Sequence, residues 1–256
     1  MPHMKIAAWN VNSIKARTAH VQRWLERVKP DFLLLQELKG LEFPHEVFDG
    51  YKIHAVGQKA YNGVAILSNS SFDVILEKLP GDDADEQARY LEIAAPDGTR
   101  IINIYLPNGN PWPGEKFDYK MRWMDRLHAR LKELRDQEIP FLIGGDFNVI
   151  PEARDCWDPT VWMNDALYRI ETRQKFRSIL NLGLTDAFRA LNQNDHQYTF
   201  WDYQAGCWPK DYGIRIDHFL LSPAVTDRLA SCTIDKEPRG EESPSDHTPV
   251  ILTIKP

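Results

Sequence analysis

Short apolar runs recur along the chain and predict β-strands. They are rich in Ile, Val, Phe and Tyr, and several are apolar throughout, as is typical of strands buried on both faces. The runs span residues 5–10, 32–37, 63–68, 90–95, 100–106, 140–146, 215–222 and 249–254. An Asp-Gly turn signal between two of them, 90–95 and 100–106, predicts a hairpin.

Apolar residues at helical spacing predict three helices, over 13–28, 116–137 and 172–182. Ser13 is a suitable N-cap for the first, which stops before Pro30, and Gly183 closes the third. So few helices between the strands argue against an all-parallel barrel. We therefore expect an α/β fold in which two mixed or antiparallel sheets stack face to face with helices on their outer faces.

Composition narrows the class of protein. The chain has 256 residues without repeats or low-complexity tracts, so we expect a single domain over 1–256. Three cysteines without a C-x-x-C pair argue against a disulfide framework or zinc cluster and favour a reducing, cytoplasmic location. The N-terminal residues show no apolar leader that would indicate secretion. No apolar run reaches the ~20 residues that a membrane span needs. With a net charge of −6, any contact with nucleic acid must be a local patch or be helped by a cation.

Polar side chains stand at the ends of several predicted strands, some at the C-terminal and others at the N-terminal end. In mixed or antiparallel sheets those ends can share one edge. We therefore predict one cluster made of Asn10, Glu37, Tyr105, Asp146, Asn148, Asp217, Asp246 and His247. Its carboxylates would repel one another at low dielectric. A hard divalent cation removes the repulsion, and carboxylate and amide oxygens are the ligands that Mg²⁺ prefers.

Each of these residues also has a purely structural interpretation. The sequence Gly144-Gly145-Asp146 can form a turn, Asp217 can pair with neighbouring Arg215, and Tyr105 can be a core aromatic with its hydroxyl at the rim. The repeated placement of polar groups at strand ends is what favours a functional cluster.

A set of motifs then carries a resemblance to a known family. The segments are WNVNSIK at 9–15, LQELK at 35–39, NGVAILS at 62–68, IYLPNG at 104–109, GGDFNV at 144–149, LTDAFR at 184–189, YTFWDY at 198–203, RIDHFLLS at 215–222 and SDHTPV at 245–250. In this order they resemble the exonuclease III family of bacterial AP endonucleases, within the endonuclease/exonuclease/phosphatase superfamily. The resemblance covers essentially the whole chain.

The resemblance implies a four-layered α/β sandwich and dependence on Mg²⁺, for which Mn²⁺ can substitute. It implies hydrolysis of DNA 5′ to an abasic site, with 3′→5′ exonuclease and 3′-end-cleaning activity. We expect a monomer whose partner is double-stranded DNA with abasic sites or 3′ ends.

The resemblance also implies metal ligands. By motif position, Glu37 resembles the family's main ligand, supported by Asn10 and Asp246. In another interpretation of the family, a second metal is held by Asp146, Asn148 and His247. The division between ligands and acid–base groups therefore stays open.

Catalytic roles follow by the same resemblance. Asp146 resembles the residue that deprotonates water or protonates the leaving oxygen, and Asn148 resembles the residue that holds the scissile phosphate. His247 with Asp217 resembles the family's His–Asp pair, and Tyr105 resembles its phosphate-contacting tyrosine. Such donors and a metal would stabilise the extra negative charge of the transition state.

Cationic side chains are candidate phosphate contacts, since such contacts dominate DNA binding. The candidates are Lys59, Lys116, Lys120, Arg122, Lys210 and Arg215, although solvated surface charge is the alternative for most of them. Asn108, after the strand that ends at Tyr105, is a further candidate DNA contact.

The resemblance suggests an apolar pocket built from Phe200, Trp201, Ile214 and Ile216. A flipped-out sugar without a base would fit there, whereas the alternative is ordinary core. The aromatic loop 201–212, with Trp208, is a candidate for wedging into the duplex or stacking on bases.

Two other functions remain open from sequence. One is a phosphoesterase of the same superfamily that acts on RNA, phosphoinositides or sphingomyelin, which would share the metal chemistry but not the substrate surface. The other is a DNA-binding module without catalysis, which would tolerate loss of Glu37, Asp146 or His247, although all three are present.

Overall fold

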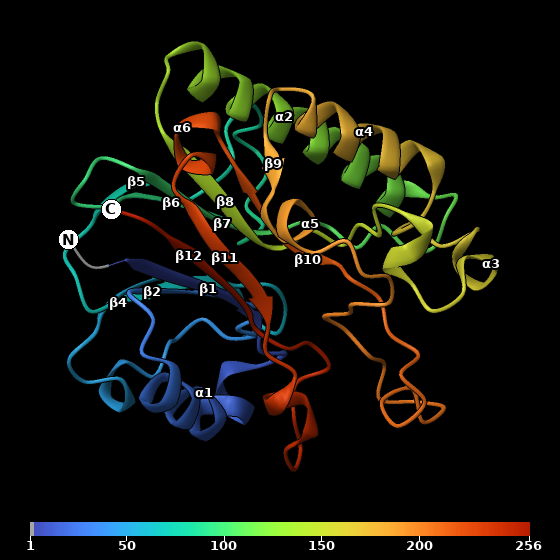
Figure 1. The fold of residues 1–256 in the computed structure, drawn as a ribbon, viewed down its shortest axis with the longest axis horizontal. Coiled ribbons are helices and arrows are strands. Elements are labelled where there is room, and N and C mark those ends of the chain that lie inside the picture. The colour runs from blue at the N-terminus through green and yellow to red at the C-terminus, as the bar shows by residue number, and fades with distance from the viewer. Residues whose placement is uncertain (1–2) are drawn as a thin grey trace.

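Two mixed six-stranded sheets form the centre of the computed structural model, which describes residues 3–256 (Figure 1). The strand order is β11-β12-β1-β2-β4-β3 in the first sheet and β5-β6-β7-β8-β10-β9 in the second. The strands are β1 (Met4–Asn10), β2 (Phe32–Gln36), β3 (Lys52–Val56), β4 (Val64–Ser68), β5 (Asp73–Leu76), β6 (Tyr90–Ala94), β7 (Arg100–Tyr105), β8 (Phe141–Asp146), β9 (Thr185–Asp186), β10 (Asp217–Leu221), β11 (Leu229–Ile234) and β12 (Val250–Ile254).

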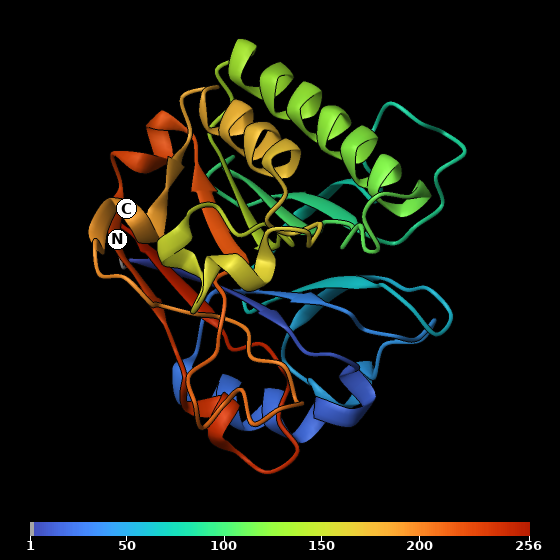
Figure 2. The same ribbon diagram turned by 90° about the vertical axis from the view of Figure 1, so that its right-hand side faces the viewer.

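Helices cover the outer face of each sheet, as Figure 2 shows in edge view. The longer ones are α1 (Ile14–Val28), α2 (Glu115–Asp136) and α4 (Ile170–Leu180); the short ones are α3 (Pro159–Trp162), α5 (Ala187–Leu191) and α6 (Pro223–Thr226). Three 3₁₀ turns span His45–Val47, Ala153–Asp155 and Glu237–Gly240. Within the described residues, no helix is long and apolar enough to cross a membrane.

Three apolar clusters hold these layers together. Side chains from both sheets, such as Ile6, Leu34 and Leu142, fill the space between the sheets. One outer face packs against α1 through Trp24 and its neighbours, and the other packs against α2 and α4. Burial of this apolar area is the main favourable term for the fold. The expected four-layered α/β sandwich is confirmed.

The predicted elements form close to their expected bounds. The three predicted helices are α1, α2 and α4, and the Ser13 side chain accepts the capping bond from the backbone N–H of Ala16. The predicted hairpin is the antiparallel pair β6–β7, with Gly98 at a φ of 83° in its turn. The apolar runs did not reveal β3, β5, β9 and β11, which are the edge strands of the two sheets.

A buried polar contact joins the two sheets at the end of β2. The Gln36 side chain donates to Asn103 Oδ1 at 2.8 Å, and the Asn103 amide donates to the backbone carbonyls of Leu35 and Ala65. Because an unpaired amide between the sheets would be costly, this contact fixes their relative position. It therefore sets where the last residues of β2 stand relative to the second sheet.

Candidate active site

The second sheet brings three of the predicted residues into one row. Asp146 ends β8, and in the β-ladder it stands opposite Tyr105 of β7 on one side and Asp217 of β10 on the other. Residues directly opposite across a ladder project from the same face. The register of three neighbouring strands therefore places two carboxylates and a phenol together.

The end of β8 depends on glycine. Gly145 has a φ of 134°, and a Cβ there would lie 2.1 Å from the carbonyl oxygen of Ile104. Only a residue without a side chain allows β7 to approach so closely. The interpretation of Gly144-Gly145-Asp146 as a simple turn is wrong, because all three residues lie within β8.

The first sheet supplies Asn10 and Glu37 from the ends of adjacent parallel strands, β1 and β2. The Asn10 amide nitrogen donates to Glu37 Oε1 at 2.8 Å and to Asp146 Oδ2 at 2.9 Å, so it bridges the two sheets. Its oxygen accepts from the backbone N–H of Asn12. In this structure Asn10 therefore orients the two carboxylates through its nitrogen.

His247 precedes β12 and closes the cluster from the first sheet. Its Nδ1 lies 2.8 Å from Asp217 Oδ2, and its Nε2 lies 3.6 Å from Asp146 Oδ2. Burial alone would lower the pKa of His247, but the Asp217 and Asp146 carboxylates outweigh burial and raise it. The imidazole is therefore held as a cation whose Nε2–H faces the cluster.

Asp146 is fully buried, and burial raises its pKa. The Asp217 and Glu37 carboxylates add to this rise, while His247 opposes it. One oxygen accepts from the backbone N–H of Asn148 at 2.9 Å, which fixes the carboxyl plane. A carboxyl whose pKa moves toward neutrality can both accept and return a proton near pH 7.

Glu37 has a different balance of forces. Burial would raise its pKa, but the hydrogen bond from Asn10 and the ammonium of Lys39, 2.9 Å away, outweigh burial and lower it. Lys39 also bonds the side chain of Asn12. Lys39 is not among the predicted site residues, although it lies two residues beyond the strand-end glutamate in the LQELK motif.

Lys120 is not a surface phosphate contact, so that prediction is wrong. Its side chain is 0% exposed, and its Nζ donates to the carbonyls of Asn108 at 3.0 Å, Asn148 at 2.6 Å and Ala166 at 3.4 Å. Burial lowers its pKa to about 7, against the opposing charges of Asp165 and Asp146. Lys120 thus ties three loops together behind the cluster.

The cluster opens into a cavity of about 300 Å³. Most predicted site residues line it, together with five residues that were not predicted to be part of the site. The lining is Glu37, Tyr105, Asn108, Asn110, Asp146, Asn148, Trp162, Asp165, Leu167, Phe200, Asp202, Ile214, Ile216, Asp246 and His247. The cavity is thus acidic on one side and apolar on the other.

The apolar wall matches the expected pocket only in part. Phe200, Ile214 and Ile216 line the cavity, and Phe200 packs edge-on against the His247 ring at 5.0 Å. Trp201 does not line it. Its indole is 0% exposed and donates to Asp211, so its prediction as a DNA contact is wrong. It points to the opposite side of the chain from its neighbour Phe200.

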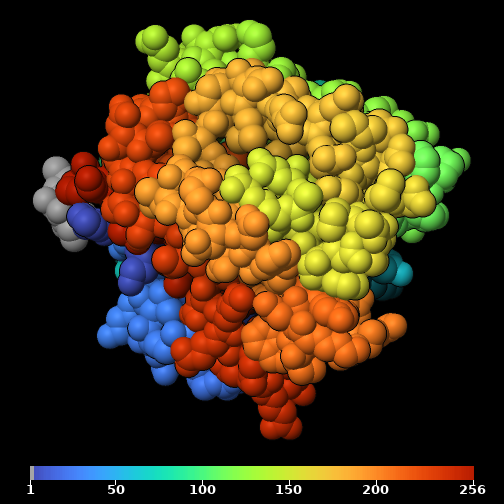
Figure 3. Space-filling model, turned by 45° about the vertical axis from the view of Figure 1, so that its right-hand side comes forward, coloured from blue at the N-terminus to red at the C-terminus, as the bar shows by residue number. Residues whose placement is uncertain are grey.

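The aromatic loop 201–212 folds back on the protein. Trp208 packs edge-on against Trp201 at 4.8 Å, and Tyr212 stacks on Trp157 at 4.0 Å. In Figure 3 this loop, in orange, lies against the yellow-green segment that contains Trp157 and α3. Whether Trp208 wedges into a duplex stays a prediction.

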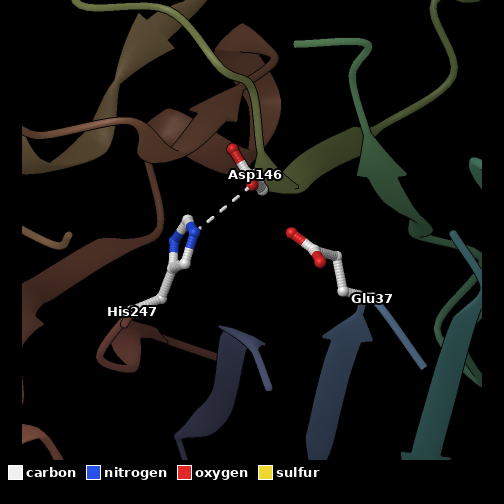
Figure 4. Close-up of side chains that lie close together, drawn as sticks. All are labelled: Glu37, Asp146 and His247. Carbon is white, nitrogen blue, oxygen red and sulfur yellow. Dashed lines mark ion pairs between the residues drawn. The ribbon is translucent and has the colours of Figure 1, made fainter. Parts of the chain in front are cut away.

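The residues available to a metal are those of the central cluster. Ligand atoms of Glu37, Asp146 and His247 all lie within 4.8 Å of one another, and Figure 4 shows the three side chains pointing toward one another. Asp246 lines the same cavity and accepts from Asn12, but it is not part of this closest group. An excess of carboxylate oxygen in a confined cavity is chemically suited to a hard divalent cation.

Comparisons with known proteins give matches over most of the chain. Residues 7–247 match the model of the endonuclease/exonuclease/phosphatase family. The chain is 31% identical to the exodeoxyribonuclease III of Haemophilus influenzae, over 98% of this chain and 100% of that protein. It is also similar to the structure of an AP endonuclease from Archaeoglobus fulgidus, with 35% identity, a TM-score of 0.93 and coverage of 99% and 100% of the two chains.

A structure of a 3′ phosphatase from Neisseria bound to a product DNA hairpin is similar as well. It is 38% identical, with a TM-score of 0.94 over 98% of this chain and 99% of that one. The match to the family model and these full-length similarities show that the chain belongs to the endonuclease/exonuclease/phosphatase family.

Proposed function

We propose that this chain is a divalent-metal-dependent DNA repair nuclease that cleaves the phosphodiester 5′ to an abasic site and trims or cleans 3′ ends. The observation that carries the proposal is a single cavity with a carboxylate–histidine cluster on one side and an apolar wall on the other. The relatives named exodeoxyribonuclease III, AP endonuclease and 3′ phosphatase support it.

The proposed cation is Mg²⁺, with Mn²⁺ able to substitute. Glu37 is the proposed principal ligand, because its lowered pKa keeps it ionised, and Asp246 and Asn10 are its proposed partners. The alternative group is Asp146, Asn148 and His247. When bound, such a cation would neutralise phosphate charge and polarise the ester.

Three donors of the chain are proposed to hold the phosphate. His247 presents a protonated Nε2 to the cavity, with Asp217 fixing its ring. Burial and the nearby carboxylates Glu37 and Asp146 raise the pKa of Tyr105, so its phenol stays a donor. Asn148 is locked by its bond to the Leu106 carbonyl, which leaves its other amide hydrogen for a phosphate oxygen. Fixed donors of this kind stabilise the transition state without reorganising.

Asp146 is proposed to move the proton. Water adds to phosphorus and loses a proton, the bond to the 3′ oxygen breaks, and that oxygen gains a proton. Asp146 can serve either end, as base toward water or as acid toward the leaving oxygen. The products are a 3′ hydroxyl and a 5′ phosphate.

The apolar wall of Phe200, Ile214 and Ile216 is proposed to select a sugar that lacks its base. A cavity of about 300 Å³ that also holds the phosphate leaves little room for a stacked nucleotide. We also propose that the chain acts as a monomer. We propose a reducing compartment, since Cys156, Cys207 and Cys232 are unpaired.

The test is a labelled duplex with one abasic analogue, incubated with Mg²⁺ or with a chelator, and resolved by product size. Incision 5′ to the analogue, lost with the chelator and restored by excess Mg²⁺, is the expected result. A second duplex with a 3′ phosphate measures end cleaning. Intact DNA in every arm would overturn the proposal.

Rival substrates are measured in the same buffer. RNA, a phosphoinositide or sphingomyelin hydrolysed faster than the abasic duplex would make the chain a different phosphoesterase of the family. DNA binding without any cleavage in Mg²⁺ would indicate a binding module.

A further inference from the structure

A second cavity, of about 280 Å³, adjoins the catalytic cavity. The two share Asn108 and Asn110, which line both. The second cavity lies between the segment that leads into β6 and the first turns of α2, where Arg89 and Lys116 also line it. The two cavities are therefore neighbours that meet at the segment 108–110.

The two cavities have opposite charge. Five carboxylates line the catalytic cavity, those of Glu37, Asp146, Asp165, Asp202 and Asp246. Among the described residues lining the second, the charged side chains are Arg89 and Lys116, and none is acidic. In a chain with a net charge of −6, a cavity with only cationic charge is suited to an anion.

Neither cation has a carboxylate partner among residues 3–256. Arg89 donates to the side-chain oxygen of Gln87 at 2.8 Å and to the carbonyl of Tyr105 at 3.1 Å, while Lys116 is exposed on the first turn of α2. The acid at the edge of this region, Asp85, is already paired with Arg126 at 2.7 Å. No carboxylate among residues 3–256 therefore forms an ion pair with either cation, although Glu115 and Asp118 share the first turn of α2 with Lys116.

We propose that this second cavity binds a backbone phosphate of the DNA strand next to the phosphate that is cleaved, with Lys116 and Arg89 as its cations. This inference rests on the proposed function and names a substrate contact outside the catalytic cavity. Arg89 is anchored by two hydrogen bonds and gives the subsite a fixed position. Lys116 is free to close on the phosphate.

The test combines Lys116→Gln with DNA in which single linkages are made neutral as methylphosphonates. We expect Lys116→Gln to raise KM about tenfold with kcat unchanged, and to reduce the slope of log kcat/KM against log salt by about 1. One neutral linkage beside the cleavage site should raise the KM of the wild type similarly. On DNA with that neutral linkage, the KM of Lys116→Gln should equal the KM of the wild type.

Lys132→Gln is the matched control. It makes the same charge change on the same helix, sixteen residues further along, where Lys132 pairs with Asp136. At a rise of about 1.5 Å per residue this is roughly 24 Å away. It should leave KM and the salt slope as in the wild type.

Two results would overturn the inference while leaving the proposed function intact. One is a Lys116→Gln variant that behaves like Lys132→Gln. The other is an effect of Lys116→Gln on KM that adds to the effect of a neutral linkage, wherever in the strand that linkage is placed. A wild-type protein that cleaves no DNA would instead remove the proposed function and this inference with it.

Discussion

Two clusters of buried charge lie close together in this protein and differ in balance. In the catalytic cluster, three carboxylates, those of Glu37, Asp146 and Asp217, face two cations, the imidazolium of His247 and the ammonium of Lys39. In the second, the buried guanidinium of Arg215 lies between Asp155, at 2.7 Å, and Asp186, at 2.9 Å. Arg189 adds a second bond to Asp155. We call this second group the arginine cluster.

The pKa values of the acids reflect this difference in charge balance. Burial would raise the pKa of Asp155 and of Asp186, but Arg215 outweighs it and lowers both. In the catalytic cluster, burial and neighbouring carboxylates raise the pKa of Asp146 instead. The arginine cluster is electrostatically complete, whereas the catalytic cluster keeps unneutralised charge that a cation and a substrate can complete.

Two histidines show the same contrast. Burial and the charge of Arg215 lower the pKa of His218 to about 4, so it is neutral, accepts from Arg215 at 3.0 Å and donates to the Val149 carbonyl. His247 is protonated, because it faces carboxylates. Asp217 pairs with His247 and not with neighbouring Arg215, so the simple salt-bridge interpretation of Asp217 is wrong.

The largest effect is expected from Asp146→Asn. This variant keeps the shape of the side chain but cannot take up a proton, so cleavage of abasic DNA should fall about 10²–10⁴-fold. The midpoint temperature of thermal unfolding should change by about 5 °C at most. Turnover near the wild-type rate, measured by single-turnover kinetics, would contradict the assignment.

Asp155→Asn probes the arginine cluster and should act on stability. Removing one carboxylate leaves Arg215 buried with a single charged partner, at a cost of about 3–5 kcal/mol in the free energy of unfolding. Asp125→Asn, in the exposed pair with Lys175, is the control and should change it by less than about 0.5 kcal/mol. Equal urea midpoints for the two variants would break the comparison.

Lys120→Met links buried charge to catalysis. Without the ammonium, the loops at Asn108, Asn148 and Ala166 lose their common donor, and kcat should fall about tenfold to a hundredfold. Lys132→Met on the exposed face of α2 controls for the loss of charge. Unchanged kcat with lowered stability would make Lys120 purely structural.

The smallest effect is a pH dependence of stability. The lowered pKa of Asp155 means that its contribution is present above its unfolded pKa, about 3.9, and is lost as the pH falls through its folded pKa. The stability gap between wild type and Asp155→Asn should therefore shrink in acid. Urea unfolding at pH 7, 4 and 2.5 measures the gap, and a gap that stays constant down to pH 2.5 would contradict the expected effect of Asp155.

Sequence predicted the central strands and the residues at their ends, because strand register alone brings Tyr105, Asp146 and Asp217 together. It missed the edge strands, whose exposed sides interrupt the apolar runs. Residues outside the sheets, such as Trp162 at the end of α3 and Asp165 in the loop after it, were also missed, since no periodicity specifies which of them reach the cavity.

The error over Lys120 is instructive. Lys120 lies three residues after Phe117 and four residues before Met124, which places it on the buried stripe of α2. A lysine on such a stripe indicates a buried ammonium with carbonyl partners. The error over Trp201 arose differently, because alternation places only Phe200 of that pair on the cavity side.

The first and last strands of the chain, β1 and β12, are hydrogen-bonded neighbours inside the first sheet, with Met4 opposite Ile254. Asn10 and His247 therefore meet only after the final strand has docked. The cluster is therefore complete only while β1 and β12 are paired, so its geometry depends on a contact between residues that are almost the whole sequence apart.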